Sequence, residues 1–225
     1  VVQFGMLSYA LNFLPMLPPL VALGTDKLTL QALVRSPKQN DTILGTALLI
    51  RSVLGLLLIP VVFYLAALLQ PQDVLLRWLI IITTSGVAFE TSNVFSFWFQ
   101  AKEKLNRAAI ARTSAFFLAL LWRVVLIWSK APLLAFAWSY LGERVLVLLS
   151  LLVFFKLSGG RPLAWRFDLR RAVELLKNGA LILFTQMMIM LFLRLDLIFL
   201  ERFSGLRAVG LYALAGKLCE PLLFI

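Results

Sequence analysis

Long apolar runs alternate with short polar stretches along the chain. A helix that crosses a bilayer needs about 20 consecutive, mostly apolar residues, and residues 179–200 form such a run. Turn-forming residues separate the runs, as in Gln70-Pro71-Gln72-Asp73. The pattern predicts an all-α membrane protein. Its expected spans, of which the first and last are incomplete, are residues 1–23, 42–69, 74–99, 113–129, 133–155, 179–200 and a run that begins near 206.

The first span contains Pro15, Pro18 and Pro19. Proline removes a backbone donor and clashes with the preceding turn, so this helix must bend or break. Carbonyls freed in this way are tolerated in a membrane only where neighbours or water satisfy them. Both a kinked helix that lines a cavity and a helix end with a packed bend fit the pattern. After the bend, we expect Asp26 to cap a short helix over residues 27–35.

Composition places the chain among integral membrane proteins. Hydrophobic residues make up 61% of it and the mean hydropathy is +0.93, whereas a soluble domain is usually about 45–50% apolar. The formal net charge of +11 does not indicate a nucleic-acid partner, because the basic residues sit between apolar runs and not in one patch. The chain has no histidine and a single cysteine, Cys219, so it offers no disulfide framework or metal-ligand spacing. We expect no cofactor and no metal.

Basic residues are distributed unequally between the two sets of connecting segments. Thirteen Lys and Arg residues fall in the segments near residues 27–38, 102–112 and 156–177, against four on the other side. By the positive-inside rule, the first set is cytoplasmic. Within the last segment, Leu169, Ala172, Val173 and Leu176 follow helical spacing, which predicts an amphipathic helix on the membrane surface.

Several stretches of the sequence together resemble a known family. They are Arg194-Leu-Asp196-Leu-Ile-Phe-Leu-Glu201, Val209-Gly-Leu-Tyr212-Ala-Leu-Ala-Gly-Lys217-Leu, residues 26–37 with Val34-Arg35-Ser36-Pro37, and Trp98-Phe99-Gln100-Ala101 before a basic linker. They resemble the polysaccharide (O-antigen type) flippases of the multidrug, oligosaccharidyl-lipid and polysaccharide exporter superfamily. In that family an R-x-D-x-x-x-L pattern ends one helix and a G-x-Y-x-x-A-x-K pattern opens the next.

The resemblance implies a polytopic membrane helix bundle that is part of a two-lobed exporter fold. Residues 1–156 would then be first-lobe helices with their start missing. Residues 157–177 would be a cytoplasmic linker with an amphipathic helix, and residues 178–225 the first helices of a second lobe whose remainder is missing. Gly5 with Pro15, and Gly210 with Pro221, hint at a repeat between two helices that the resembled fold pairs across its lobes.

The resemblance also implies a function. Such a protein flips a lipid-linked (pyrophosphate) oligosaccharide to the outer leaflet for the assembly of surface polysaccharide such as lipopolysaccharide. It is a multi-pass protein of the bacterial inner membrane and works by alternating access. Its partners would be the lipid-linked oligosaccharide, membrane lipid, a proton or sodium ion, and polysaccharide assembly proteins.

Charged residues inside the predicted spans are the candidate site, since ionisable groups at membrane depth are costly and usually face a bundle interior or a wet cavity. Arginine suits phosphate oxygens through its fixed fork of donors. The hypothesis assigns substrate binding to Arg51, Arg123, Arg144 and Arg194. It assigns a counter-ion or ion-coupling role to Glu90, Glu143, Asp196 and Lys217. The alternative is mutual neutralisation, because buried charges normally pair: Lys217 would pair with Glu220, whereas the adjacent Glu143 and Arg144 would find partners on different helices.

Two other functions fit parts of the pattern. A multidrug-type exporter would share the architecture, although it should bury fewer cations. A membrane-embedded enzyme that acts on lipid-linked sugars would also be apolar and basic. It would need a catalytic carboxylate or histidine on a sizeable loop outside the membrane, and the predicted outer loops are short. We therefore expect a transporter and not an enzyme.

Overall fold

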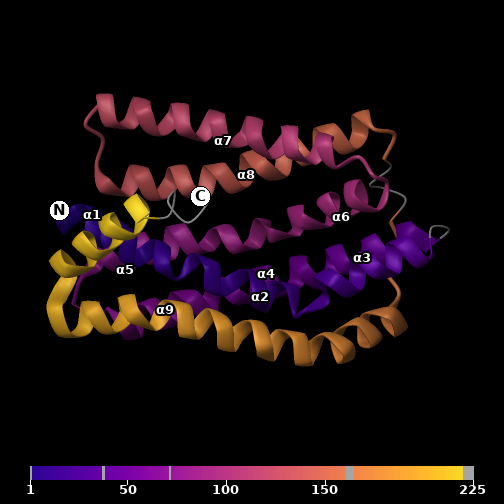
Figure 1. Ribbon diagram of the computed structural model, residues 1–225, viewed down its shortest axis with the longest axis horizontal. Coiled ribbons are helices and arrows are strands. Elements are labelled where there is room, and N and C mark those ends of the chain that lie inside the picture. Colours follow the sequence, from indigo (N-terminus) through magenta and orange to yellow (C-terminus); the bar gives the residue numbers. More distant parts are fainter. Residues whose placement is uncertain (1, 37–38, 71, 161–164, 220–225) are drawn as a thin grey trace.

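The computed structural model describes residues 2–36, 39–70, 72–160 and 165–219, and within these residues it is helical with no strand. Helices run side by side along one long axis (Figure 1). This confirms the predicted all-α membrane bundle. The elements are α1 (Val2–Asn12), η1 (Leu14–Met16), α2 (Leu17–Ala22), α3 (Thr25–Arg35), α4 (Asn40–Leu69), α5 (Val74–Ser85), η3 (Gly86–Ser92), α6 (Asn93–Ala101), α7 (Leu105–Trp128), α8 (Leu133–Leu157) and α9 (Leu169–Cys219).

Five segments of the described chain are long and apolar enough to cross a membrane: Gln3–Ala22, Asn40–Leu68, Val74–Ala101, Leu105–Trp128 and Leu169–Ile189. The ends of α3, α6 and α8 and the start of α9 gather at one end of the bundle, and the α7–α8 connection and the last bend of α9 lie at the other (Figure 1). We call the first end the basic end. Its described Lys and Arg residues are Arg35, Lys102, Lys104, Arg107, Lys156, Arg166, Arg170 and Arg171. The assignment of this end to the cytoplasm stays a prediction.

The prolines bend the first span as expected. α1 ends at Asn12, one turn of 3₁₀ helix contains Pro15, and α2 follows from Leu17. Leu23 and Gly24 then adopt left-handed backbone conformations, with φ of 46° and 70°, which turn the chain into α3. The expectation that Asp26 caps this helix is wrong. Gly24 occupies the cap position and α3 begins at Thr25, so the Asp26 carboxylate is left for another contact.

The third predicted span is divided by η3, a 3₁₀ segment of 7 residues between α5 and α6. Thr83 donates from its hydroxyl to the Leu79 carbonyl oxygen at 2.8 Å, and Ser85 donates to that of Ile81 at 2.6 Å. Hydroxyls that bond back to the preceding turn tend to bend helices. These side chains are therefore satisfied within their own helix, and their polarity does not require a cavity.

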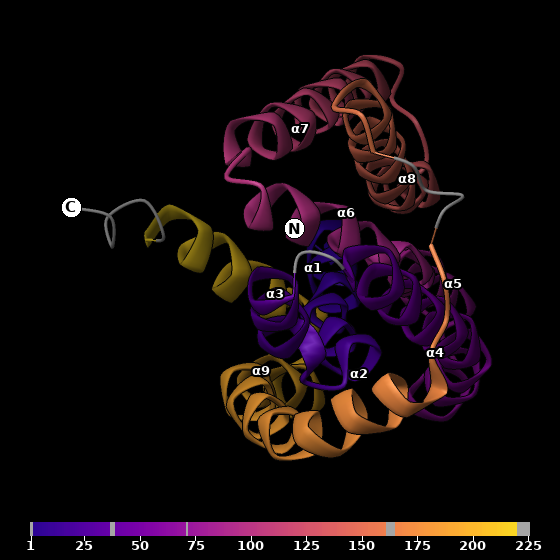
Figure 2. The same cartoon turned by 90° about the vertical axis from the view of Figure 1, so that its right-hand side faces the viewer.

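α9 covers 51 residues in two helical parts that meet at a kink at Gly205, where φ is 75° and ψ is 175°. The predicted surface helix and the predicted span after it both lie in the first part and are not separated. The kink lies immediately before the predicted run that begins near residue 206. In Figure 1 this helix runs the length of the bundle and then turns back toward α1. Figure 2 shows it on the side of the bundle opposite the α7–α8 hairpin, with α1 to α4 between them.

Two kinds of packing hold the elements together. At the basic end, Phe95, Phe99 and Phe155 form an aromatic core that Trp165 partly covers. α7 packs through a stripe of buried alanines, Ala108, Ala111, Ala115 and Ala119, and small residues of this kind let two membrane helices approach closely. The other face of α7 exposes large apolar side chains, as expected of a surface that meets lipid.

Candidate functional site

α1, α2 and α3 lie along α9, and glycines set the closest approaches between them. A Cβ atom at Gly24 would lie 2.2 Å from the carbonyl oxygen of Gly179, and one at Gly179 would lie 2.3 Å from that of Leu23. Near the opposite end, a Cβ atom at Gly5 would lie 2.1 Å from the carbonyl oxygen of Leu206. Backbone therefore touches backbone at two levels of this interface, and any larger residue there would force the helices apart.

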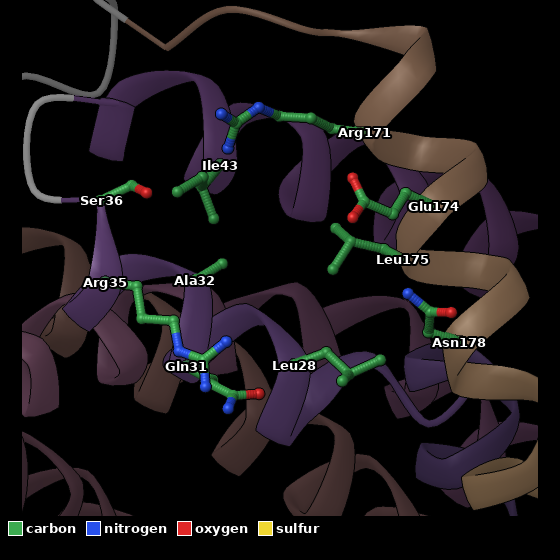
Figure 3. Close-up of a pocket in the computed structure, with 10 residues that line it drawn as sticks. All are labelled: Leu28, Gln31, Ala32, Arg35, Ser36, Ile43, Arg171, Glu174, Leu175 and Asn178. Atoms are coloured by element: carbon green, nitrogen blue, oxygen red, sulfur yellow. The ribbon is translucent and has the colours of Figure 1, made fainter.

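Two cavities lie in the same interface. The first, which we call the vestibule, has a volume of about 380 Å³. It is at the basic end and is lined by Leu28, Gln31, Ala32, Arg35, Ser36, Ile43, Arg171, Glu174, Leu175 and Asn178 (Figure 3). The second, which we call the deep cavity because it lies further along α9 from the basic end, is an open hollow of about 360 Å³ lined by Pro15, Pro18, Pro19, Asp26, Gln186 and Ile189. Along α9, the contact at Gly179 lies between the two.

The first span combines both interpretations, because α1 ends at Asn12 and Pro19 is buried, while the bend also lines the deep cavity. Asp26, on the wall of the deep cavity, forms an ion pair with Arg51 of α4. The Arg51 side chain is only 1% exposed, whereas that of Asp26 is 42% exposed. The guanidinium also lies 5.1 Å from the centre of the Phe97 ring, and its Nε has no hydrogen-bond partner. A buried cation is therefore neutralised by a carboxylate that the cavity can reach.

A second ion pair lies on the other side of the proline bend. Arg144 Nη1 of α8 donates to Glu90 Oε1 of η3 at 3.2 Å, and Asn93 Nδ2 donates to Glu90 Oε2 at 2.6 Å. Arg112 of α7 extends the network, since its Nη2 donates to Asn93 Oδ1 at 2.7 Å. Glu90 and Arg144 also line a narrow gap together with Pro18. Pro18 therefore faces both this gap and the deep cavity.

The third pair holds the α7–α8 hairpin together, away from both cavities. Arg123 pairs with Glu143, donates from Nε to Ser139 Oγ at 3.2 Å, and lies 3.9 Å above the Tyr140 ring. Glu143 and Arg144 do find partners on different elements, as the sequence predicted. The structure does not bring Arg51, Arg123 and Arg144 into one cavity, and each of them pairs with a carboxylate.

The remaining candidate residues lie on the last part of the chain. Asp196 Oδ2 accepts a hydrogen bond of 2.7 Å from the Tyr212 hydroxyl, which joins the two parts of α9 across Gly205. The side chains of Arg194 and Lys217, and the whole of Glu220, lie outside the described residues. Sequence reasoning also missed Asp26, Arg112 and Gln186. Arg112 was missed because α7 begins earlier than its apolar run, at Leu105.

No group of three or more His, Cys, Asp or Glu residues within the described part of the chain could hold a metal ion. A family model described as polysaccharide biosynthesis protein matches residues 1–222. No curated protein and no solved structure matches the chain significantly.

Proposed function

The chain belongs to the polysaccharide biosynthesis protein family, and on this premise we propose that it flips a lipid-linked oligosaccharide across the bacterial inner membrane. Family and fold together make it a multi-pass membrane protein with a role in polysaccharide biosynthesis. The proposal goes beyond this role in three respects: the lipid-linked oligosaccharide as substrate, the bacterial inner membrane as location, and flipping as the step. We also propose that the protein is not an enzyme. The short connections at the end of the bundle opposite the basic end, residues 70–73 and 129–132, support this.

The observation that carries the proposal is the deep cavity with Asp26, the ion-pair partner of the buried Arg51, in its wall. A lipid-linked oligosaccharide carries a diphosphate, and charge of that kind does not cross hydrocarbon without polar partners. Arg51 is held at membrane depth in α4, and Asp26 is its partner at the cavity. A phosphate group has the charge and oxygen geometry to replace that carboxylate. In this mechanism, the diphosphate takes the place of Asp26 as the partner of Arg51.

Arg144 has a related role in the proposal. Its partner Glu90 is 7% exposed and borders the gap next to Pro18. Movement of the proline bend would join this gap to the deep cavity and bring a second guanidinium to the diphosphate. Glu90 is then the counter-ion that keeps Arg144 neutralised until that movement. Arg123, in the hairpin, lines neither cavity, which makes its pair with Glu143 a natural control.

The test separates substrate binding from structural pairing. Removing one member of a buried ion pair leaves an uncompensated charge, which typically costs about 3–5 kcal/mol, whereas replacing both members is often tolerated. We therefore compare the double variant Asp26→Asn/Arg51→Gln with the matched double variant Arg123→Gln/Glu143→Gln. Both remove one carboxylate and one guanidinium, and both leave amides of similar size. Protein level in the membrane and polysaccharide at the cell surface are measured for each.

We expect both double variants to accumulate in the membrane and only the control to export polysaccharide. The single variant Arg51→Lys should export part of the normal amount of polysaccharide, because lysine keeps the positive charge but lacks the bidentate fork of arginine. Normal export by Asp26→Asn/Arg51→Gln would refute a role for Arg51 in substrate binding. Loss of export by both double variants would show that ion pairs in this bundle act on the fold and not on the substrate.

A further inference from the structure

The vestibule is built differently from the deep cavity, because two arginines face it from opposite walls. Arg35 comes from α3 and Arg171 from α9, and both side chains extend toward the space between the helices in Figure 3. Its volume of about 380 Å³ lies in the range of small-molecule sites in proteins, about 300–1,000 Å³. The vestibule is therefore large enough to hold a ligand headgroup.

The hydrogen-bonding capacity of these arginines is mostly unused. Among the described residues, no ion pair or hydrogen bond involves the Arg35 guanidinium, and the guanidinium of Arg171 donates only to the neutral amide oxygen of Gln39. A guanidinium carries five N–H donors. Glu174, one turn along α9 from Arg171, is the one carboxylate in the lining and pairs with neither arginine. The cavity thus has a net positive charge with donors to spare.

Neutral donors and apolar groups complete the lining. Gln31 and Asn178 present amides, and Leu28 and Leu175 present apolar surface on facing walls (Figure 3). Just beyond the cavity, α9 exposes Leu181, three residues after Asn178, with an exposed fraction of 76%. The exposed Leu169 and Val173 lie on the opposite face of the helix, because successive residues turn by about 100°. An anionic group in the vestibule would therefore have the apolar side chains of Leu175 and Leu181 near it on the same helix. This combination fits an anion that is attached to a hydrocarbon chain.

We propose that the vestibule is a second anion site, separate from the deep cavity, which binds the phosphate of a membrane lipid. Arg35 and Arg171 hold the phosphate oxygens from two sides, and the lipid chain leaves the cavity past Leu175 and Leu181 of α9. The Gly24–Gly179 contact keeps this site apart from the deep cavity. The phosphate can belong to an anionic phospholipid or to the diphosphate of a lipid-linked sugar. Only the second source rests on the proposed function.

The experiment measures how lipids stabilise the purified full-length protein in a neutral detergent. A ligand that binds only the folded state stabilises it by RT ln(1 + [L]/Kd), so the rise of the thermal unfolding midpoint with ligand concentration reports the Kd. The probes are a short-chain phosphatidylglycerol, a short-chain polyprenyl diphosphate, and a short-chain phosphatidylcholine as the zwitterionic reference. Each is titrated against the native chain, the cavity variant Arg35→Gln/Arg171→Gln and the control variant Arg170→Gln/Lys177→Gln. The control removes two cations from the same stretch of α9, but from positions that do not line the vestibule.

We expect phosphatidylglycerol, the diphosphate or both to bind the native and control proteins more tightly than phosphatidylcholine does. The cavity variant should bind the same probe about tenfold more weakly, which corresponds to about 1.4 kcal/mol. The probe that shows this loss identifies the source of the phosphate. Equal weakening in cavity and control variants would mean attraction to the basic surface in general and would overturn the proposal, as would unchanged binding by the cavity variant. Arg35 is exposed and unpaired among the described residues, and the Arg171 guanidinium loses only its hydrogen bond to Gln39, so midpoints without lipid should differ little among the three proteins. A failure of flipping would leave the phosphatidylglycerol result intact.

Discussion

Gly179 offers a direct test of the interface between α3 and α9, because its substitution by alanine has a predictable cost. A Cβ atom there would lie 2.3 Å from the Leu23 carbonyl oxygen and 3.3 Å from Thr25 Cγ2. The closer obstacle is backbone, so it cannot move aside as a flexible side chain would. Either α9 or the turn before α3 must shift. Overpacking of this kind typically lowers the free energy of unfolding by about 1–3 kcal/mol. The higher helix propensity of alanine raises it by about 1 kcal/mol relative to glycine.

Gly216, in the part of α9 after the kink, is the control, because a Cβ atom there would meet nothing within 4 Å. Gly216→Ala should gain the propensity term alone, so the difference between the two variants isolates the overpacking term of about 1–3 kcal/mol. Thermal unfolding of the purified proteins, followed by tryptophan fluorescence, gives the comparison. We expect a clearly lower midpoint for Gly179→Ala than for Gly216→Ala. An equal or higher midpoint would show that α3 and α9 do not meet at Gly179, and would remove the boundary between the vestibule and the deep cavity.

Further predictions concern topology and the other ion pairs. A reporter fused after Lys104 should be cytoplasmic and one after Gln72 external, because basic segments stay inside; the same side for both would remove a predicted span. Glu90→Gln and Arg144→Gln should each lower the unfolding midpoint, and a double-mutant cycle should yield a coupling of roughly 0.5–3 kcal/mol, whereas strictly additive effects would mean that the pair is not formed. Arg123→Lys should lower the midpoint through loss of ring stacking and hydrogen bonds while export continues; normal stability would argue against the hairpin contacts.

The features that depend on one segment of chain could be predicted from the sequence. The length of an apolar run determines whether a helix can cross a bilayer. The predicted spans 42–69 and 74–99 match the segments Asn40–Leu68 and Val74–Ala101, which are long and apolar enough to do so. The bend at Pro15 follows from the chemistry of a single residue type. The separation of Glu143 and Arg144 follows from the roughly 100° turn per residue of a helix, and their partners do come from different elements.

Features that depend on two distant segments could not be predicted. Asp26 and Arg51 are 25 residues apart, and no pattern in either segment indicates that the two side chains form an ion pair. Hydropathy also misplaced helix boundaries. Apolar runs show where a helix is inside the bilayer, and not where its backbone hydrogen bonding begins. For this reason α9 starts at Leu169, ahead of its predicted span, and α7 starts at Leu105 with Arg112 inside it.

The glycine contacts limit how transport could proceed under the proposed function. A contact of backbone with backbone has no rotamers through which it could open gradually, so Gly24 and Gly179 separate only if whole helices move. Gly205 is suited to absorb such a movement, because its φ of 75° is already non-helical and a Cβ atom there would meet nothing within 4 Å. The hydrogen bond between Tyr212 and Asp196 spans this point and holds the two parts of α9 at one angle. A diphosphate that moves from the vestibule to the deep cavity therefore requires α9 to swing as a body before Gly205, with that hydrogen bond as the restraint on the angle.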